Sequence, residues 1–301
     1  MLQIRGVKAQ IYAVFTVFTV IVIMVVYLYP KGNCKQGLRI CDWNVEWFGM
    51  PKMKEIFNSI NMPLYDKMVD NMYDIKYYID LIAPDIICFQ EVASISTIQT
   101  LTEYLLHYDL HYDSNLVKSD QQFNVFLVKK NVQVIQFVVV DDLHKMIRLD
   151  FRHAGNNISL YNVHLKADYE GNFSDIRVKQ TQFLNDYMKQ NYNPNTIITG
   201  DTNSQPGSKE LEILENTYIN VIFSRKCHLK VEKKDSLWFD KDKNDTISGN
   251  ELFLIDYYLV SRDAYKLVDQ MMIYAILYQK SFQYDISNKI SDHYPIILDL
   301  Y

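Results

Sequence analysis

The stretches LRICDWNVEWFG, residues 38–49, and PDIICFQEV, residues 84–92, decide the fold of this chain. Each contains a short apolar run, which predicts a strand buried in a sheet. Polar and acidic residues end both runs, with Asn44 and Glu46 in the first and Glu91 in the second. Loops at one edge of a rigid sheet are where functional sites are built. The two stretches therefore predict buried strands that carry a polar site at their ends.

Strand-like and helix-like segments alternate from these stretches to the C-terminus. Helical spacing of apolar residues predicts helices over Tyr65–Ile82, which Pro84 ends, over Ile95–Leu106 and over Ile176–Tyr192. Strands are expected at Leu38–Val45, Asp85–Gln90, Phe123–Val128, Val132–Val140, Met146–Phe151, Ile158–Val163, Thr196–Gly200, Leu254–Val260, Met272–Leu277 and Pro295–Leu300. Several consecutive strands leave no room for helices between them. This pattern favours two packed mixed sheets flanked by helices over a single parallel sheet.

The N-terminal region is organised differently from the rest. Residues 1–10 form a short basic tail, residues 11–29 the uncharged run IYAVFTVFTVIVIMVVYLY, and residues 30–37 a linker to one domain at 38–301. As a helix this run would be about 28 Å long, close to the hydrocarbon thickness of a bilayer. We interpret it as a transmembrane anchor. A cleaved signal segment, which would make the protein secreted, and a buried core helix are the alternatives.

The net charge of the chain limits the kinds of partner that it can bind. The chain has 31 Lys and Arg against 36 Asp and Glu, a net charge of -5. Residues 1–36 hold four basic residues and no acidic ones, so the remainder carries 27 basic against 36 acidic residues. An acidic domain has no broad positive field, which argues against tight non-specific binding of nucleic acid. Acidic residues gathered in a metal site would add to this balance without excluding a phosphate substrate.

Acidic, Asn and His residues recur at the ends of the predicted strands. These residues are Asn44, Glu46, Glu91, His164, Asp201, Asn203, Asp256, Asp292 and His293. One buried carboxylate at a strand end is usually a structural hydrogen-bond partner. A whole set is hard to accommodate in a core, because each buried charge costs several kcal/mol unless it is paired or bound to a metal. The set therefore predicts one polar site.

Six motifs in the chain resemble the endonuclease/exonuclease/phosphatase superfamily, of which pancreatic deoxyribonuclease is a member. They are CDWNVEWFG (41–49), PDIICFQEV (84–92), YNVHLKA (161–167), ITGDTNSQPGS (198–208), LIDYYLVS (254–261) and SDHYPI (291–296). They occur in the family's order across residues 38–301. The resemblance implies a four-layer α/β/β/α sandwich with the site where the loops of the two sheets converge.

The resemblance also implies a divalent metal site. Glu91 would be the principal Mg²⁺ ligand, helped by Glu46 and Asp292. Hard oxygen ligands of this kind suit Mg²⁺ or Mn²⁺.

The remaining residues would serve catalysis. Asn44 and Asn203 would hydrogen-bond the phosphate or the attacking water, and His164 would contact a phosphoryl oxygen. His293 would pair with Asp256, and Asp201 would orient or deprotonate the water. Whether His293 or Asp201 is the base stays open. The chemistry needs a cation, a base and hydrogen-bond donors for the developing charge.

Residues Asp240–Glu251, DKDKNDTISGNE, resemble a calcium loop of the EF-hand type. Asp245 replaces the glycine that the sharp turn at the sixth position requires, and a strand instead of a helix is expected afterwards. An ordinary polar loop is therefore favoured over a Ca²⁺ site.

The resemblance implies a metal-dependent hydrolase of phosphate esters, and a DNase-like endonuclease with nucleic acid as substrate is the first expectation. A membrane-associated phosphodiesterase of the sphingomyelinase type is the enzymatic alternative, which a membrane anchor favours. A catalytically inactive adaptor displayed on a membrane is the alternative of another class. No motif predicts a protein partner.

Overall fold

A computed structural model describes residues 37–49, 72–115, 122–141, 145–168, 171–227, 236–238, 252–273 and 291–301. Residues Leu38–Tyr301 form one compact unit. The expected anchor at residues 11–29 and the calcium loop at residues 240–251 lie outside the described residues. Within the described ranges, no helix is both long and apolar enough to cross a membrane. Both expectations stay predictions.

The first of two six-stranded sheets contains both stretches that decide the fold. Its strands lie in the order β13 (Val268–Ile273), β14 (Ile296–Leu300), β1 (Leu38–Phe48), β2 (Ile86–Val92), β4 (Phe123–Lys129) and β3 (Tyr108–His111). β1 and β2 are parallel, with Ile40 opposite Ile86, whereas β14 runs antiparallel to β1. The end of β1, the end of β2 and the start of β14 therefore lie at one edge of the sheet.

The second sheet brings the remaining motifs together. Its order is β5 (Gln133–Val139), β6 (Met146–His153), β7 (Asn156–His164), β8 (Thr196–Asp201), β12 (Asp256–Val260) and β9 (Ile219–Asn220). The parallel pairing of β7 with β8 places His164 beside Asp201, and the antiparallel pairing of β12 places Asp256 opposite Asp201. Three predicted site residues from separate motifs are thus neighbours by strand register alone.

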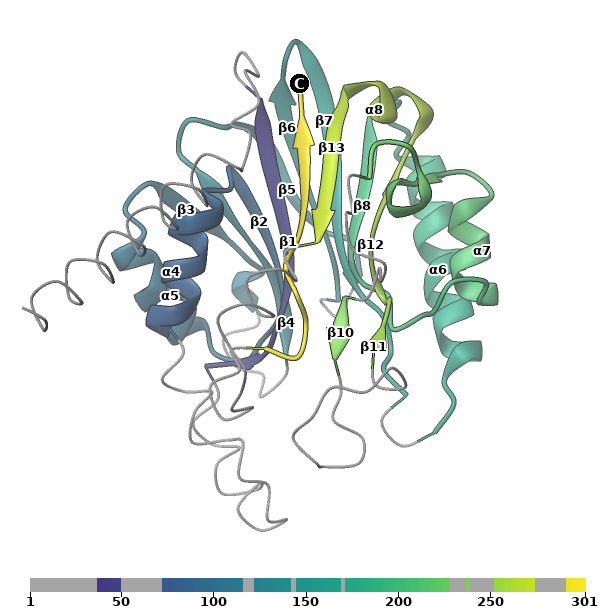
Figure 1. The fold of residues 1–301 in the computed structure, drawn as a ribbon, viewed down its shortest axis with the longest axis horizontal. Coiled ribbons are helices and arrows are strands. Elements are labelled where there is room, and N and C mark those ends of the chain that lie inside the picture. The colour runs from purple at the N-terminus through teal and green to yellow at the C-terminus, as the bar shows by residue number, and fades with distance from the viewer. Residues whose placement is uncertain are drawn as a thin grey trace, which may run out of the picture. The chain divides into compact units, whose positions relative to one another are not determined.

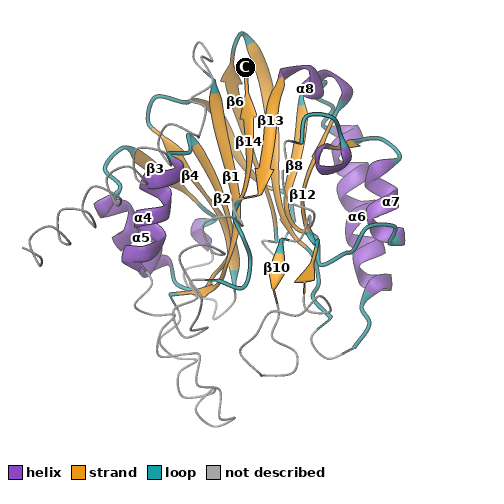
Figure 2. Cartoon of the chain, viewed as in Figure 1, coloured by secondary structure: helices purple, strands orange, loops and turns teal. Residues whose placement is uncertain are grey.

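Helices cover the outer faces of the two sheets. Figure 1 shows α4 (Met72–Ile82) and α5 (Ile95–Tyr104) on one side of the molecule, and α6 (Ser174–Gln190) and α7 (Lys209–Glu215) on the other. Figure 2 shows the strands packed between these two helical layers. Short elements complete the described chain, namely η2 (Val221–Phe223), α8 (Arg262–Leu267) and the strand pair β10 (Leu237–Trp238) and β11 (Leu252–Phe253).

The core lies between the sheets. Fully buried apolar side chains of Ile40 and Phe126 from the first sheet join Leu160 and Ile198 from the second in one cluster. Burying an apolar side chain of this size stabilises the fold by about 1.5–3 kcal/mol. The predicted α/β/β/α sandwich is therefore confirmed.

Some predicted elements differ from the structure. The strand expected at Met272–Leu277 begins earlier, at Val268, and residues 274–277 lie outside the described part. The helix expected to reach Leu106 ends at Tyr104. β3 and α7 were not predicted, because elements of four and seven residues are too short to show a clear periodicity.

Gly200 brings β8 close to β7, and its replacement should be strongly destabilising. Its φ is +132°, and a Cβ atom there would lie 1.9 Å from the carbonyl oxygen of Val163. We expect Gly200→Ala to lower the free energy of unfolding by on the order of 3 kcal/mol or more, measured by denaturant unfolding. Gly155→Ala is the matched control, since Gly155 also has a positive φ, +80°, but nothing lies within 4 Å. Equal losses in the two variants would contradict the steric explanation.

Candidate functional site

The predicted site residues converge at one edge of the paired sheets. The first sheet contributes Asn44 and Glu46 from β1, Glu91 from β2, and Asp292 and His293 from the segment before β14. The second sheet contributes His164 and Asp201 from the ends of β7 and β8, Asn203 after β8, and Asp256 from the start of β12. Hydrogen bonds and close ion pairs between the sheets join Asn44 to Asp201 and His293 to Asp256. The convergence that the motifs predict is present.

Two strand irregularities determine the orientation of Glu46 and Glu91. The β1–β2 pairing shifts register between Asn44 and Phe48, and the β2–β4 pairing shifts between Phe89 and Val92. Within these shifts Glu46 has a φ of 42° and Glu91 a φ of 58°. Bulges bend a strand and redirect side chains, and positive φ in residues other than glycine concentrates at functional sites. Both acids are therefore held in backbone conformations that an ordinary strand would not adopt.

Asn44 connects the two halves of the site. Its side chain is fully buried, and its Nδ2 donates to Oε1 of Glu91 at 3.0 Å and to Oδ2 of Asp201 at 3.0 Å. Its Oδ1 accepts the backbone N–H of Glu46 at 3.0 Å. The carboxamide of Asn44 thus holds the side chains of Glu91 and Asp201 and the bulged backbone at Glu46.

His293 and Asp256 form a buried pair. Nδ1 of His293 lies 2.9 Å from Oδ2 of Asp256, and Nε2 faces Oδ2 of Asp201 at 3.7 Å and Oδ1 of Asp292 at 3.8 Å. Burial lowers the pKa of His293, but the carboxylates of Asp256, Asp292 and Asp201 outweigh it and hold the pKa well above the usual value. These carboxylates therefore favour the protonated form of His293, whose Nε2 faces the site.

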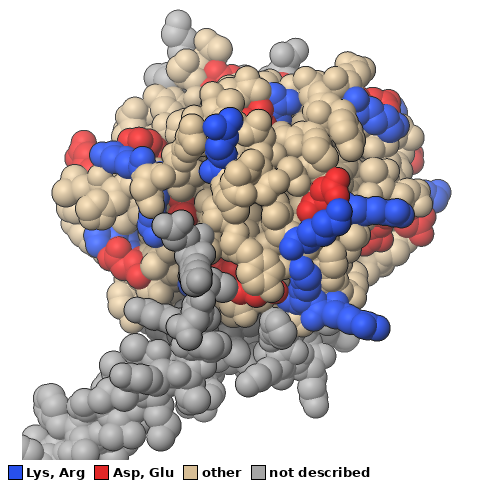
Figure 3. Space-filling model, turned by 90° about the horizontal axis from the view of Figure 1, so that it is seen from above, with Lys and Arg blue, Asp and Glu red and all other residues tan. Residues whose placement is uncertain are grey.

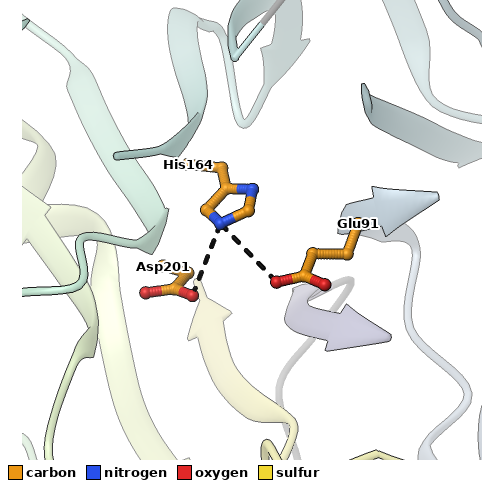
Figure 4. A group of neighbouring side chains, drawn as sticks. All are labelled: Glu91, His164 and Asp201. Atoms are coloured by element: carbon orange, nitrogen blue, oxygen red, sulfur yellow. Dashed lines mark ion pairs between the residues drawn. The ribbon is translucent and has the colours of Figure 1, made fainter. Parts of the chain in front are cut away.

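His164 has the opposite electrostatic character. Its Nε2 lies 3.7 Å from Oε1 of Glu91 and 3.7 Å from Oδ2 of Asp201, and Figure 4 shows the ring pointing between the two carboxylates. Burial, followed by the nearby charge of Lys145, lowers its pKa well below the usual value. The pKa values of the two histidines are thus shifted in opposite directions, because their charged neighbours differ.

Asp201 lies between the histidines. Its side chain is 1% exposed, and its Oδ1 accepts the backbone N–H of Asn203 at 2.7 Å. Burial raises the pKa of Asp201 to about 7, against the stabilising charge of His293. A carboxylate with a pKa near neutrality is suited to accept a proton.

The raised pKa of Asp201 predicts a pH-dependent stability difference. The folded protein binds the Asp201 proton more tightly than the unfolded chain, whose pKa is about 3.9. This stability is fully present below pH 4 and is lost as pH rises through about 7. The side chain in Asp201→Asn cannot ionise, so this variant does not lose that stability. Its free energy of unfolding, relative to that of wild type, should therefore rise by on the order of a few kcal/mol between about pH 4 and pH 7. Denaturant unfolding with a chelator present measures the difference, and parallel pH curves would contradict the prediction.

Glu46 and Asp292 lie beside each other but face different groups. Oε2 of Glu46 accepts the backbone N–H of Asp292 at 2.9 Å. Oδ1 of Asp292 is buried and has no hydrogen-bond partner. The charge of Asp292 contributes to raising the pKa of Glu91, after burial.

Within the described ranges, the compact groups of ligand atoms differ from the predicted ligand set. One group is Glu91, His164 and Asp201, and the other is Asp201, Asp256 and His293. Glu46 and Asp292 belong to neither group. The second group is already joined by the bond between His293 and Asp256. The carboxylate of Glu91 and Oδ1 of Asp292, which accepts no hydrogen bond from the described residues and lies 3.8 Å from Nε2 of His293, are hard donors that fit Mg²⁺ or Mn²⁺.

Asn203 takes part in the site mainly through its backbone. Its φ is 49°, and its Nδ2 donates to the carbonyl oxygen of Leu165 at 3.0 Å. One N–H of the carboxamide is therefore engaged in holding the loop after β7. The predicted contact of Asn203 with a phosphate stays a prediction.

Sequence reasoning missed Lys145 and Gln122. Nζ of Lys145 lies 3.3 Å from Nδ1 of His164 and 3.5 Å from Oε1 of Gln122, and Gln122 donates to Oε2 of Glu91. Burial lowers the pKa of Lys145. Neither residue lies in one of the six motifs. Lys145 comes just before β6 and meets His164 because β6 runs antiparallel to β7. The signal that marks Lys145 is its position shortly before a strand, which it shares with Asp292 and His293.

Comparison with solved structures identifies the fold. An endonuclease/exonuclease/phosphatase family protein from Bacteroides thetaiotaomicron matches with a TM-score of 0.65 at 14% identity, covering 88% of this chain and 97% of that one. The chain has the endonuclease/exonuclease/phosphatase fold. TDP2 of D. rerio, complexed with a single-strand DNA product, matches with a TM-score of 0.62 at 18% identity, covering 88% of this chain and 99% of that one.

Another bacterial protein of this fold is similar to the chain. The mannosyl-6-phosphatase of Bacteroides thetaiotaomicron matches with a TM-score of 0.65 at 14% identity, covering 88% of this chain and 99% of that one. No family model matches the sequence, and no curated protein does. The endonuclease/exonuclease/phosphatase fold that the six motifs predict is therefore confirmed from structure.

Proposed function

We propose that this protein is a divalent-metal-dependent hydrolase of phosphate esters. One observation carries the proposal: Asp201, whose pKa is raised to about 7, and His293, whose pKa is held well above its usual value, face each other at 3.7 Å within an acidic site at the sheet edge. Titratable groups whose pKa values are shifted by burial and by a specific charged partner are typical of catalytic sites. The fold supports the same activity class, because phosphatase and nuclease names occur among the similar structures.

The electrostatics support distinct roles for these two residues. Asp201, with a pKa of about 7, would accept the proton of the attacking water. His293, whose pKa is held well above its usual value, would donate a hydrogen bond from Nε2 to a phosphoryl oxygen. Asp256 would keep the imidazole ring oriented through its 2.9 Å contact with Nδ1. Of the two candidate bases, these charges favour Asp201.

The other polar side chains would bind and position the phosphate. Asn44 would hold Asp201 in place, and His164 and Lys145 would contact phosphoryl oxygens from the second sheet. Glu91, with Glu46 and Asp292, would hold Mg²⁺ or Mn²⁺, which neutralises charge on the phosphate when bound. Oxygen donors at these positions, one of them without a hydrogen-bond partner, support that assignment.

A nucleic-acid phosphodiester is the first substrate proposal. TDP2 of D. rerio, which has this fold, was solved with a single-strand DNA product. The face seen in Figure 3 carries basic and acidic side chains close together, so this face offers no broad basic surface for nucleic acid. A lipid phosphodiester of the sphingomyelinase type is the alternative, motivated by the apolar run at residues 11–29. The full set of site residues speaks against an inactive adaptor.

A substrate panel tests this proposal. Full-length protein in detergent would be assayed with Mg²⁺ or Mn²⁺ against plasmid DNA, single-stranded DNA, RNA, sphingomyelin, inositol phosphates and sugar phosphates. Activity that needs the metal, survives in His107→Ala and disappears in His293→Ala is the expected result. His107 is exposed and lies after α5, so it is the matched histidine control. Metal-independent activity, or none on any phosphate ester, would exclude the proposal.

We also propose that residues 11–29 anchor the protein in a membrane. The support is the length and uncharged composition of this run, which matches a bilayer-spanning helix. Full-length protein should fractionate with membranes and resist alkaline extraction. An uncleaved chain recovered in the soluble fraction would refute the anchor.

A further inference from the structure

Asp42 is a buried acid next to the site that the proposed mechanism does not use. It lies two residues before Asn44 on β1, and its side chain is 1% exposed. Its Oδ1 accepts from Nε2 of Gln90 at 2.7 Å, and the same nitrogen donates to Oδ1 of Asn162 at 2.8 Å. Because Asn162 belongs to β7, this network lies between the two sheets, directly behind the site.

The packing of the two sheets brings β1, which carries Asp42, against β12, which carries Asp256. The hydroxyl of Tyr258 on β12 donates to the carbonyl oxygen of Ile40 on β1 at 3.0 Å. Alternate residues of a strand point to the same face, so Asp256, two residues before Tyr258, and Asp42, two residues after Ile40, lie on the facing surfaces. Both acids lie one step nearer the site edge than this contact. Asp256 is accordingly the strongest charge acting on Asp42.

Each of these two acids has one oxygen without a partner. Oδ2 of Asp42 and Oδ1 of Asp256 are both buried and accept no hydrogen bond from any described residue, while Oδ2 of Asp256 contacts His293. Two ionised carboxylates here would repel each other and leave both oxygens unsatisfied. One proton between them removes the repulsion and supplies the missing donor. A carboxylic acid kept neutral by an apolar site, and used as a donor, is an established device in enzymes.

The other groups around Asp42 do not supply this donor. Asp201 on β8 and His293 act on Asp42 by charge, and Cys88 on β2 and Tyr258 on β12 are buried neighbours. The Tyr258 hydroxyl donates to backbone carbonyls. Burial, followed by the charge of Asp256, raises the pKa of Asp42 well above its usual value.

We propose that Asp42 is a protonated positioning residue, whose carboxylic O–H donates to Oδ1 of Asp256 and thereby fixes the carboxylate that orients His293. The site thus contains a buried chain of Asp42, Asp256 and His293. Its kinetic consequence rests on the proposed function, whereas the protonation of Asp42 does not.

The kinetic test compares two substitutions of Asp42 in the full-length protein. Asp42→Asn keeps an acceptor for Gln90 and an N–H donor for Asp256, so it should retain most of kcat. Asp42→Leu removes the donor and should lower kcat by about 10–100-fold with KM little changed, as loss of orienting groups typically does. Asn220→Leu is the control for loss of a buried polar group remote from the site. Equal kcat in the Asn and Leu variants would overturn the positioning role.

Infrared spectroscopy tests the proton itself and needs no substrate. At a pH well above 7, where Asp201 is ionised, wild type should still show the carbonyl band of a protonated carboxylic acid. Asp42→Asn should lose this band, and Asp299→Asn, which alters a half-buried ion-paired acid, should keep it. Absence of the band in wild type, or its persistence in Asp42→Asn, would overturn the proposal even if Asp42→Leu failed to fold.

The two arms separate this inference from the proposed function. A band that depends on Asp42 in a protein without phosphoesterase activity would uphold the protonated acid and reject the function. Activity without such a band would uphold the function and reject the protonated acid.

Discussion

His293→Ala and Asp256→Ala are each expected to lower kcat by about 10²–10³-fold, as removal of one donor to developing charge typically does, with substrate affinity little changed. The two side chains form one buried unit, in which Oδ2 of Asp256 lies 2.9 Å from Nδ1 of His293. Without His293 the site loses its cationic donor, and without Asp256 the imidazole loses both its orientation and the main charge that keeps it protonated. Steady-state hydrolysis of the active substrate, at saturating metal, measures both effects.

The double variant provides the sharper test of a shared role. Groups that act as a unit are not additive, so the double variant should lose little more than either single variant. Added Mg²⁺ or Mn²⁺ should restore neither, because a cation cannot replace the donor on Nε2. The exposed His107 supplies the control, and His107→Ala should keep the wild-type rate. If His293→Ala matched wild type at saturating metal, the catalytic reading of this site would be wrong.

Glu91→Gln should instead produce a defect that metal partly relieves. The substitution keeps the size of the side chain and removes its charge, so the metal concentration for half-maximal activity should rise by about 100-fold or more. This magnitude follows because altering groups that only orient metal ligands already costs about 10–100-fold. Both carboxylate oxygens also accept amide hydrogen bonds, from Asn44 and Gln122, and a carboxamide can satisfy only one of them.

Metal titration of activity and direct calorimetric titration measure this effect independently. The exposed acid Glu212 on α7 offers the control, since Glu212→Gln also removes one negative charge. A Glu91→Gln protein with the wild-type metal dependence would remove Glu91 from the ligand set. The remaining candidates would then be Glu46 and Asp292, and the compact group members His164 and Asp201.

The order of elements and most of the site could be predicted because they depend on local patterns. Buried strands such as Ile86–Val92 show as uninterrupted apolar runs, and helices such as Ser174–Gln190 show as apolar residues at helical spacing. The polar residues that end these strands must then meet, because parallel strands end at one edge and antiparallel strands begin there. Glu91, His164 and Asp201 were predicted in this way.

Local sequence patterns could not predict the orientation of the side chains in the site. Glu46 and Glu91 depend on bulges with positive φ, which arise from the pairing of β1, β2 and β4. Glu46 consequently faces the backbone N–H of Asp292 and does not join Glu91 in one compact ligand group. Lys145 lies in the site because β6 pairs antiparallel with β7, and no sequence motif contains it.

By itself the sequence determined the sandwich and the residue types at its edge, because strand burial and strand ends are encoded in neighbouring residues. Only the tertiary structure decided the charges of those residues. His293 and Asp256 are 37 positions apart and touch only when the two sheets pack. The protonation preferences of His293, His164 and Asp201 depend on burial and on charges from the opposite sheet. A pKa depends on neighbours in space, and packing alone brings these neighbours together.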